Sequence, residues 1–153
     1  MNATHSQDEL PGLATLHPAY FALVMATGIV SVAAHLLGYE TIAWPLFLLN
    51  ILFYIGLWVL FIGRAVRHPQ SVLADLRHHG RSVGFFTMVA GTSVLGSQFL
   101  LVGDMRAPAV ALWIVGIVLW AALTYSIFTA LTIKHDKPTL AEGINGGWLV
   151  AVV

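Results

Sequence analysis

The chain has 153 residues, of which 58% are hydrophobic and 9% are charged, and its net charge is zero. A soluble domain carries about 25% charged residues, so a chain this poor in charge is expected to fold in a lipid bilayer. The seven cationic residues are scattered along the chain, which gives no indication of nucleic-acid binding, and the absence of cysteine excludes disulfides and thiolate metal sites.

Four stretches without charge are long enough to cross a bilayer, because a transmembrane helix needs about 20 apolar residues. They predict helices at about 18–38, 42–66, 83–103 and 107–133. The segment before the first helix, MNATHSQDEL, contains two acids and no lysine or arginine. The first helix is therefore expected to be a transmembrane helix and not a cleavable signal peptide.

The joins between the first and second helices and between the third and fourth are very short, so the helices pair as antiparallel hairpins. Gly38 and Gly103 are expected to end the first and third helices in the left-handed conformation. The predicted fold is an all-α membrane protein of repeated hairpins, with four full spans and the beginning of a fifth. The predicted segments are an N-terminal tail (1–17), hairpin 1 (18–66), a basic connection (67–82), hairpin 2 (83–133), a second connection (134–142) and a truncated helix start (143–153).

The distribution of cations predicts the orientation in the membrane. Six of the seven lie in the two long connections and only Arg106 lies on the opposite side. Because positive charge is retained in the cytoplasm, both connections and the N-terminus are expected on the cytoplasmic side of a bacterial-type inner membrane. The six are Arg64, Arg67, Arg77, Arg81, Lys134 and Lys137.

The two hairpins look like copies of one unit. A shift of 65 residues places FALVMATGIVSVAAHLLG on FTMVAGTSVLGSQFLLVG, with five identities in 18 positions. The second helices match more loosely, but helix ends and basic exits agree, which favours a duplicated hairpin. Parallel repeats of this kind pack around an axis along the membrane normal and can enclose a central path, although two hairpins alone cannot.

Hydroxyls and glycines interrupt the apolar pattern at matching places in both copies. One interpretation is helix packing, because small residues let transmembrane backbones approach and hydroxyls bond to neighbouring helices. The other is the wall of a water-filled path, to which Gln98 would also contribute, since a central path requires an equivalent face in each copy. The candidate pore-lining residues are Thr27, Gly28, Ser31, Thr92, Ser93 and Gly96.

The interiors of the predicted helices lack Asp, Glu, Lys and Arg. Proton-coupled transporters usually carry such residues at depth, so their absence favours passive or weakly coupled conduction, and it removes one barrier to anions. Asn50 is expected to bond to a neighbouring helix. Aromatic residues concentrate in the second and fourth helices, which favours an outer, lipid-facing ring for these two and an inner position for the first and third.

Histidine is the one residue type that invites a cofactor interpretation. Only His35 lies well inside a predicted helix, and a bis-histidine haem would need a second histidine at matching depth. We therefore expect no cofactor and no metal. Nothing resembles a nucleophile, a paired-carboxylate site or a phosphate loop, so the chain is not expected to be an enzyme.

Several segments together resemble the tellurite-resistance/C4-dicarboxylate transporter family, which includes the yeast malic-acid transport protein and the slow anion channels of plant guard cells. The most specific is HPAYFALVMATGIVSVAAHLLG, supported by the basic connection, by GFFTMVAGTSVLGSQF and by EGINGGWLVAVV. The resemblance covers the whole chain, and the chain covers about the first half of such a protein.

The resemblance implies ten helices in five hairpins, with the odd helices around a pore, and protomers that associate as trimers. It implies anionic substrates: chloride, nitrate, malate and other dicarboxylates, or tellurite by phenotype. The first and third helices would then be pore wall. The phenylalanine that gates the family's pore belongs to the ninth helix, so no gate is assigned here. Two alternatives stay open: a non-transporting membrane anchor or assembly subunit, and a haem- or quinone-binding redox subunit.

Overall fold

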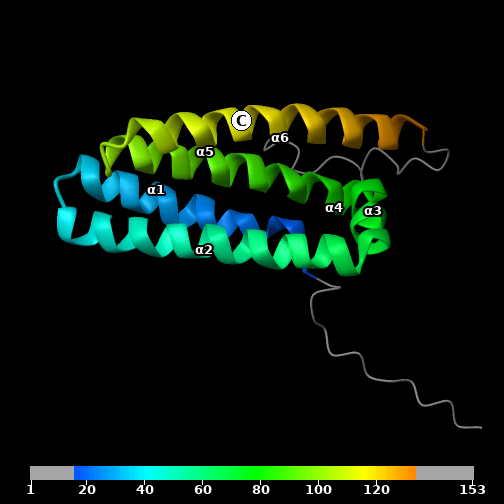
Figure 1. Cartoon of the computed structure of the whole chain (residues 1–153), viewed down its shortest axis with the longest axis horizontal. Helices are drawn as coiled ribbons and strands as arrows, with labels where there is room; N and C mark the ends of the chain where they lie inside the picture. Colours follow the sequence, from blue (N-terminus) through cyan, green and yellow to red (C-terminus); the bar gives the residue numbers. More distant parts are fainter. Residues whose placement is uncertain (1–15, 134–153) are drawn as a thin grey trace, which may run out of the picture.

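The structure is a computed structural model of the chain, and it describes residues 16–133. Four long helices form two antiparallel hairpins that lie side by side (Figure 1). The first hairpin consists of α1 (Ala22–Leu36) and α2 (Glu40–Arg67), and the second of α5 (Phe86–Leu101) and α6 (Arg106–Ile133). All four helical segments are long and apolar enough to cross a membrane. The prediction of an all-α, multi-pass membrane protein built from hairpins is therefore confirmed.

The duplication is visible in the way each inner helix begins. A short 3₁₀ helix, η2 (Pro18–Phe21), leads into α1, and another, η3 (Val83–Phe85), leads into α5 at the matching position of the second copy. The second helices of the two hairpins, α2 and α6, are both 28 residues long. Two hairpins of the same construction therefore follow each other along the chain.

The two hairpin turns differ from the expected pair of glycine caps. Gly38 has φ +82°, a conformation that an L side chain rarely adopts, as predicted for this position. In the second turn the left-handed residue is Asp104, with φ 48°, so the predicted cap at Gly103 was wrong. Gly103 is instead needed for space, because a Cβ there would lie 2.8 Å from Met105 Cε and 3.1 Å from the Phe99 carbonyl oxygen.

The basic connection between the hairpins is itself helical, with α3 (Pro69–Arg77) followed by α4 (His79–Ser82). Asp75 of α3 joins it to the bundle: its carboxylate lies 2.7 Å from Arg64 Nη2, at the end of α2, and 2.9 Å from Arg81 Nε. Arg64 is only 1% exposed. We call this end of the bundle, which carries Arg64, Arg67, Arg77 and Arg81, the basic end.

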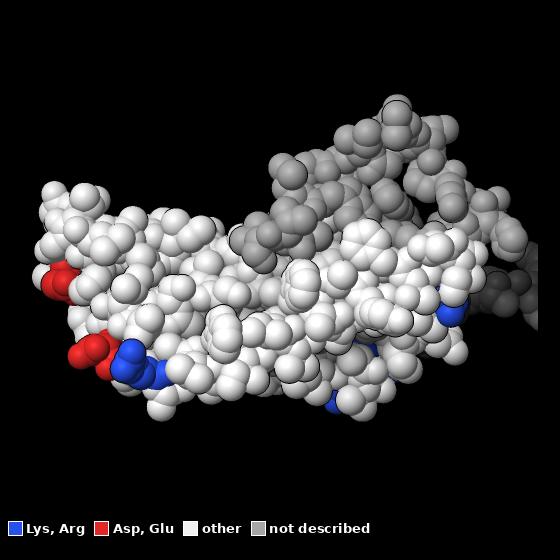
Figure 2. Space-filling view, turned by 90° about the horizontal axis from the view of Figure 1, so that it is seen from above, with Lys and Arg blue, Asp and Glu red and all other residues white. Residues whose placement is uncertain are grey.

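Burial separates the helices into an inner and an outer pair. Within the most apolar stretch of each span, 61% of the residues are buried for the span containing α5 and 28% for that of α1, against 11% for both α2 and α6. The expectation that the even-numbered helices of the two hairpins form the lipid-facing side agrees with this order. The charged side chains gather toward the two ends of the visible face, and the surface between them is uncharged (Figure 2).

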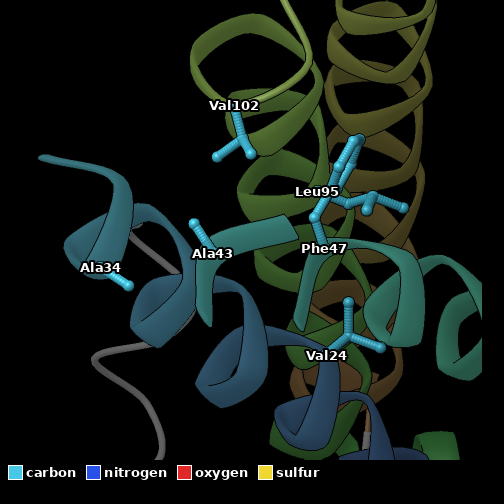
Figure 3. Packing of buried hydrophobic residues seen from close by; sticks show 6 residues of the cluster. All are labelled: Val24, Ala34, Ala43, Phe47, Leu95 and Val102. Atoms are coloured by element: carbon cyan, nitrogen blue, oxygen red, sulfur yellow. The ribbon is translucent and has the colours of Figure 1, made fainter. Parts of the chain in front are cut away.

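The apolar core lies where α1, α2 and α5 meet. Its buried members come from all three helices and from the turn after α5: Val24, Ala34, Ala43, Phe47, Leu95 and Val102 (Figure 3). The predicted connection 134–142, the predicted helix start 143–153 and most of the predicted tail 1–17 lie outside the described residues.

Candidate substrate path

The three candidate residues of α1 face different surroundings. Ser31 is fully buried, and its hydroxyl donates a 2.8 Å hydrogen bond to the Ala43 carbonyl oxygen of α2. Gly28 is also buried, and a Cβ there would lie 2.9 Å from Asn50 Nδ2 and 3.1 Å from Gln98 Oε1. Thr27 is half-buried. Two of the three therefore lie in the contact between α1, α2 and α5.

The candidates of α5 are divided in the same way. Thr92 is fully buried, and its hydroxyl donates to the Met88 carbonyl oxygen at 2.7 Å and lies 3.0 Å from the Tyr54 hydroxyl of α2. Gly96 is buried against α6, because a Cβ there would lie 3.5 Å from the Ala109 carbonyl oxygen. Ser93 is exposed.

The six candidates thus do not share one surface in this two-hairpin unit. Gly28, Ser31 and Thr92 lie in helix contacts, whereas Thr27 and Ser93 retain accessible surface. Gly96 is buried but lines a groove together with Ser93. Because a closed path needs further hairpins, the assignment of a pore wall stays a prediction.

An open groove of about 370 Å³ runs between α5 and α6 on the side of Ser93. Ser93 and Ser97 line it from α5, and Arg106 lines it from the first residue of α6. The Ser97 hydroxyl donates to the Ser93 carbonyl oxygen at 3.1 Å. Hydroxyls and a guanidinium are groups that attract and hydrogen-bond anions.

A polar ladder that the residue patterns did not predict lies between α2 and α5. The Asn50 amide donates to the Gln98 amide oxygen, and both side chains are fully buried. The predicted bond from Asn50 to another helix is confirmed, but Gln98 is buried instead of facing water. Tyr54 follows Asn50 by four residues, so both lie on one face of α2. That spacing, read together with the hydroxyl and the amide on α5, was the signal that could have indicated the ladder.

His35 lies at the end of α1 and not deep in the span as expected. Its Nδ1 is 2.8 Å from Glu40 Oε1, at the first residue of α2. Within residues 16–133 no three His, Asp or Glu side chains gather as a metal site would require.

At the basic end, His17 caps η2 by accepting a 3.1 Å hydrogen bond from the Ala19 amide. Burial, followed by the positive charge of Arg81, lowers the pKa of His17, while the carboxylate of Asp75 opposes this shift. The neutral imidazole is therefore the form that this end of the bundle favours.

The comparisons with known proteins agree with this architecture. Residues 15–153 match the family model SLAC1, described as voltage-dependent anion channel. The chain belongs to the SLAC1 family. The family suggested by the sequence motifs is thereby confirmed.

Relatives of this SLAC1-family chain include an uncharacterized transporter of Methanocaldococcus jannaschii, 26% identical over 88% of this chain and 40% of the relative. A sulfite efflux pump of Arthroderma otae is 28% identical over 96% of this chain and 42% of the relative. The chain thus spans about two-fifths of the length of these curated relatives. No solved structure matches the chain significantly.

Proposed function

We propose that the protein transports small anions across the membrane, as a channel or a carrier, and that α1 and α5 are two of the inner helices around the path. The observation that carries this proposal is the recurrence of one construction in both hairpins. In each, a slim helix with hydroxyls and no Asp, Glu, Lys or Arg is the more buried one, and a bulkier helix is the more exposed one. Membership of the SLAC1 family supports the same function.

The proposed substrates are small inorganic or dicarboxylate anions. An uncharged path presents no fixed negative charge to repel them, and Arg106 beside the hydroxyls of Ser93 and Ser97 offers a cation at one end. Chloride, nitrate, malate and tellurite are the candidates that the family resemblance suggests, and sulfite joins them from the names of the fungal relatives. We further propose a homo-oligomer, in line with the trimers of the resembled family, in an inner membrane with the basic end toward the cytoplasm.

Flux measurements on the full-length protein in liposomes test the proposal. Proteoliposomes loaded with chloride, nitrate, malate or sulfite should release at least one of these anions faster than protein-free vesicles. If a folded and correctly inserted protein released none of them, the non-transporting membrane anchor would be the better account.

Cysteine substitution tests whether the accessible candidates face the path. The 153 residues contain no cysteine, so a single introduced thiol is easy to follow in this part of the protein. A negatively charged, water-soluble methanethiosulfonate should react with Thr27→Cys and Ser93→Cys and reduce flux. Ser31→Cys is the matched control, because Ser31 is fully buried against Ala43.

The reactivity of the three thiols separates the two interpretations of the hydroxyls. Protection of Thr27→Cys and Ser93→Cys to the same degree as the control would mean that both positions contact neighbouring helices, as small residues often do.

A further inference from the structure

A second groove, unrelated to the candidate path, lies at the basic end between α3 and α6. It measures about 740 Å³ and opens to the outside of the bundle. Its walls come from the last two turns of α3, the residue that follows α3, and the last turns of α6. They are Leu73, Ala74, Arg77, His78, Tyr125, Ser126, Thr129, Ala130 and Ile133.

The polar groups in this groove are donors that suit a phosphate. Arg77 and His78 stand on one wall, and the exposed hydroxyls of Ser126 and Thr129 on the other. Within residues 16–133 no acid pairs with Arg77, because Asp75, two residues earlier, is held by Arg64 and Arg81. The guanidinium of Arg77 is therefore available to an anion from outside the described part of the bundle.

The position of the groove along α6 indicates what kind of anion it suits. The uncharged stretch of α6 ends at Ile133, directly before Lys134, so the groove on the last turns of α6 lies near the expected boundary between hydrocarbon and headgroups. The rest of the lining is apolar or aromatic, and it includes Leu73 and Tyr125; Tyr125 precedes the two hydroxyl residues on the side toward the middle of the span. A cationic, hydroxyl-bearing pocket beside the exposed surface of α6 matches a lipid with a negative headgroup, and basic pockets between transmembrane helices bind such headgroups.

We propose that this groove binds an anionic phospholipid, with its phosphate against Arg77, His78 and the hydroxyls of Ser126 and Thr129, and an acyl chain along α6 from Tyr125 toward the middle of the span. Such a lipid would join α3 to α6. It would thereby couple the connection between the hairpins to the outer helix of the second one. The proposal does not depend on the anion-transport function, because none of the candidate path residues lines this groove.

Native mass spectrometry of the full-length protein tests the lipid site. The protein is incubated with equal amounts of dioleoylphosphatidylglycerol and dioleoylphosphatidylcholine, and the retained molecules of each are counted. The wild type should retain phosphatidylglycerol preferentially, and Arg77→Gln should lower that preference about fivefold, the effect of about 1 kcal/mol for one basic residue near a membrane surface.

The matched control is Arg67→Gln. Arg67 is exposed at the same end of the bundle and carries the same charge, but it does not line the groove. Thr129→Trp is a second variant, which fills the groove and leaves both basic residues in place. It should also lower retention of phosphatidylglycerol, so the test does not depend on the stability of one variant.

Three results would overturn the proposal. One is equal retention of the two lipids by the wild type, as expected if another part of the protein fills the groove. Another is an equal loss in Arg67→Gln and Arg77→Gln, which would indicate a diffuse effect of charge. The third is displacement of the lipid by millimolar glycerol 3-phosphate, which would indicate a site for a free phosphate. Lipid retained in the presence of glycerol 3-phosphate supports the lipid as the ligand.

Discussion

The helices α1 and α5 are copies by sequence but not by environment. Both follow a short 3₁₀ helix, and the phenylalanines at matching positions, Phe21 and Phe86, are both buried. Yet the buried share of the most apolar stretch is 61% for the span of α5 and 28% for that of α1. The reason is that α5 contacts both helices of the first hairpin, α1 and α2, as well as its own partner α6. Among the helices of residues 16–133, α1 has long neighbours only in α2 and α5. In a repeat protein the neighbours, and not the repeat sequence, decide which copy becomes the core.

Matching positions show the same divergence residue by residue. Gly28 is closely surrounded by α2 and α5, whereas its counterpart Ser93 is exposed. Two residues earlier the relation between the copies is reversed. Ala26 is exposed, and a Cβ on its counterpart Gly91 would lie 3.2 Å from the Phe21 carbonyl oxygen. Gly91 thus leaves room for the backbone of the neighbouring copy, whereas Gly28 leaves room for side chains of α2 and α5.

The two copies are also joined differently at the basic end. The start of α1 is capped by His17, while the segment before α5 is held by the ion pairs of Asp75. Thr87 links the two starts, because its hydroxyl lies 3.1 Å from the Pro18 carbonyl oxygen and 2.7 Å from that of Gly84. Paired substitutions can therefore measure how much the surroundings of the two copies differ.

The largest effect is expected from Asp75→Ala, which removes the carboxylate that faces the buried Arg64. Loss of one partner of a buried ion pair costs about 3–5 kcal/mol in the free energy of unfolding, because a charge stays buried without its counterion. Titration with sodium dodecyl sulfate in mixed micelles measures this. Glu40→Ala is the control: Glu40 is half exposed in its pair with His35, and its loss should cost less than about 1 kcal/mol. Equal losses in the two variants would contradict the burial of the Asp75 cluster.

The next largest cost in the free energy of unfolding is expected for Gly28→Ala, and Ser93→Ala is the variant with which it is compared. A methyl group at Gly28 meets Asn50 and Gln98, and overpacking of this kind costs about 1–3 kcal/mol. Replacement of the exposed Ser93 by alanine, which removes a hydroxyl, should change stability by less than about 0.5 kcal/mol. The comparison uses the same unfolding titration. A similar cost at both positions would mean that the copies are equivalent in the assembled protein.

A smaller difference is expected between Thr92→Val and Thr27→Val. Thr92 loses its contact with Tyr54, at a cost of about 1 kcal/mol, whereas the half-buried Thr27 loses less. Tyr54→Phe should match Thr92→Val, and the double variant should cost no more than either single one. Additive losses in the double variant would show that the two hydroxyls do not interact.

The smallest expected effect is a dependence of the protein's stability on pH. The pKa of His17 is lower in the folded protein than its ordinary value of 6.5, so the unfolded chain binds more protons between the two values. Stability should therefore fall as the pH drops through about 6.5 and be constant above it. His17→Asn keeps an acceptor for the Ala19 amide and should flatten this slope, measured as the melting temperature between pH 5 and pH 8. An unchanged slope would assign the pH dependence to other groups.

Residue patterns were sufficient for the spans and for their pairing. Each follows from a local cause: hydrophobic length predicts the spans, and short joins predict the hairpins. The lipid-facing position of α2 and α6, which their bulky aromatic residues favour, stays a prediction. The family resemblance was also carried by local motifs. The predicted left-handed cap at Gly103 was wrong: Asp104 adopts that conformation, and Gly103 is closely surrounded by Met105, Phe99 and the distant Phe47, which the local pattern does not reveal.

The sequence by itself determined that this chain crosses a membrane as two antiparallel hairpins of one design. In a bilayer every backbone polar group must be satisfied within the helix, so apolar length dictates the helical spans and the short joins dictate their antiparallel pairing. Only the tertiary structure decided that α5 is the centre, that Gly28 makes room for the Asn50–Gln98 pair, and that Thr27 and Ser93 keep accessible surface. These features depend on side chains that come from separate helices, and the pattern within one helix carries no information about which neighbour it will meet.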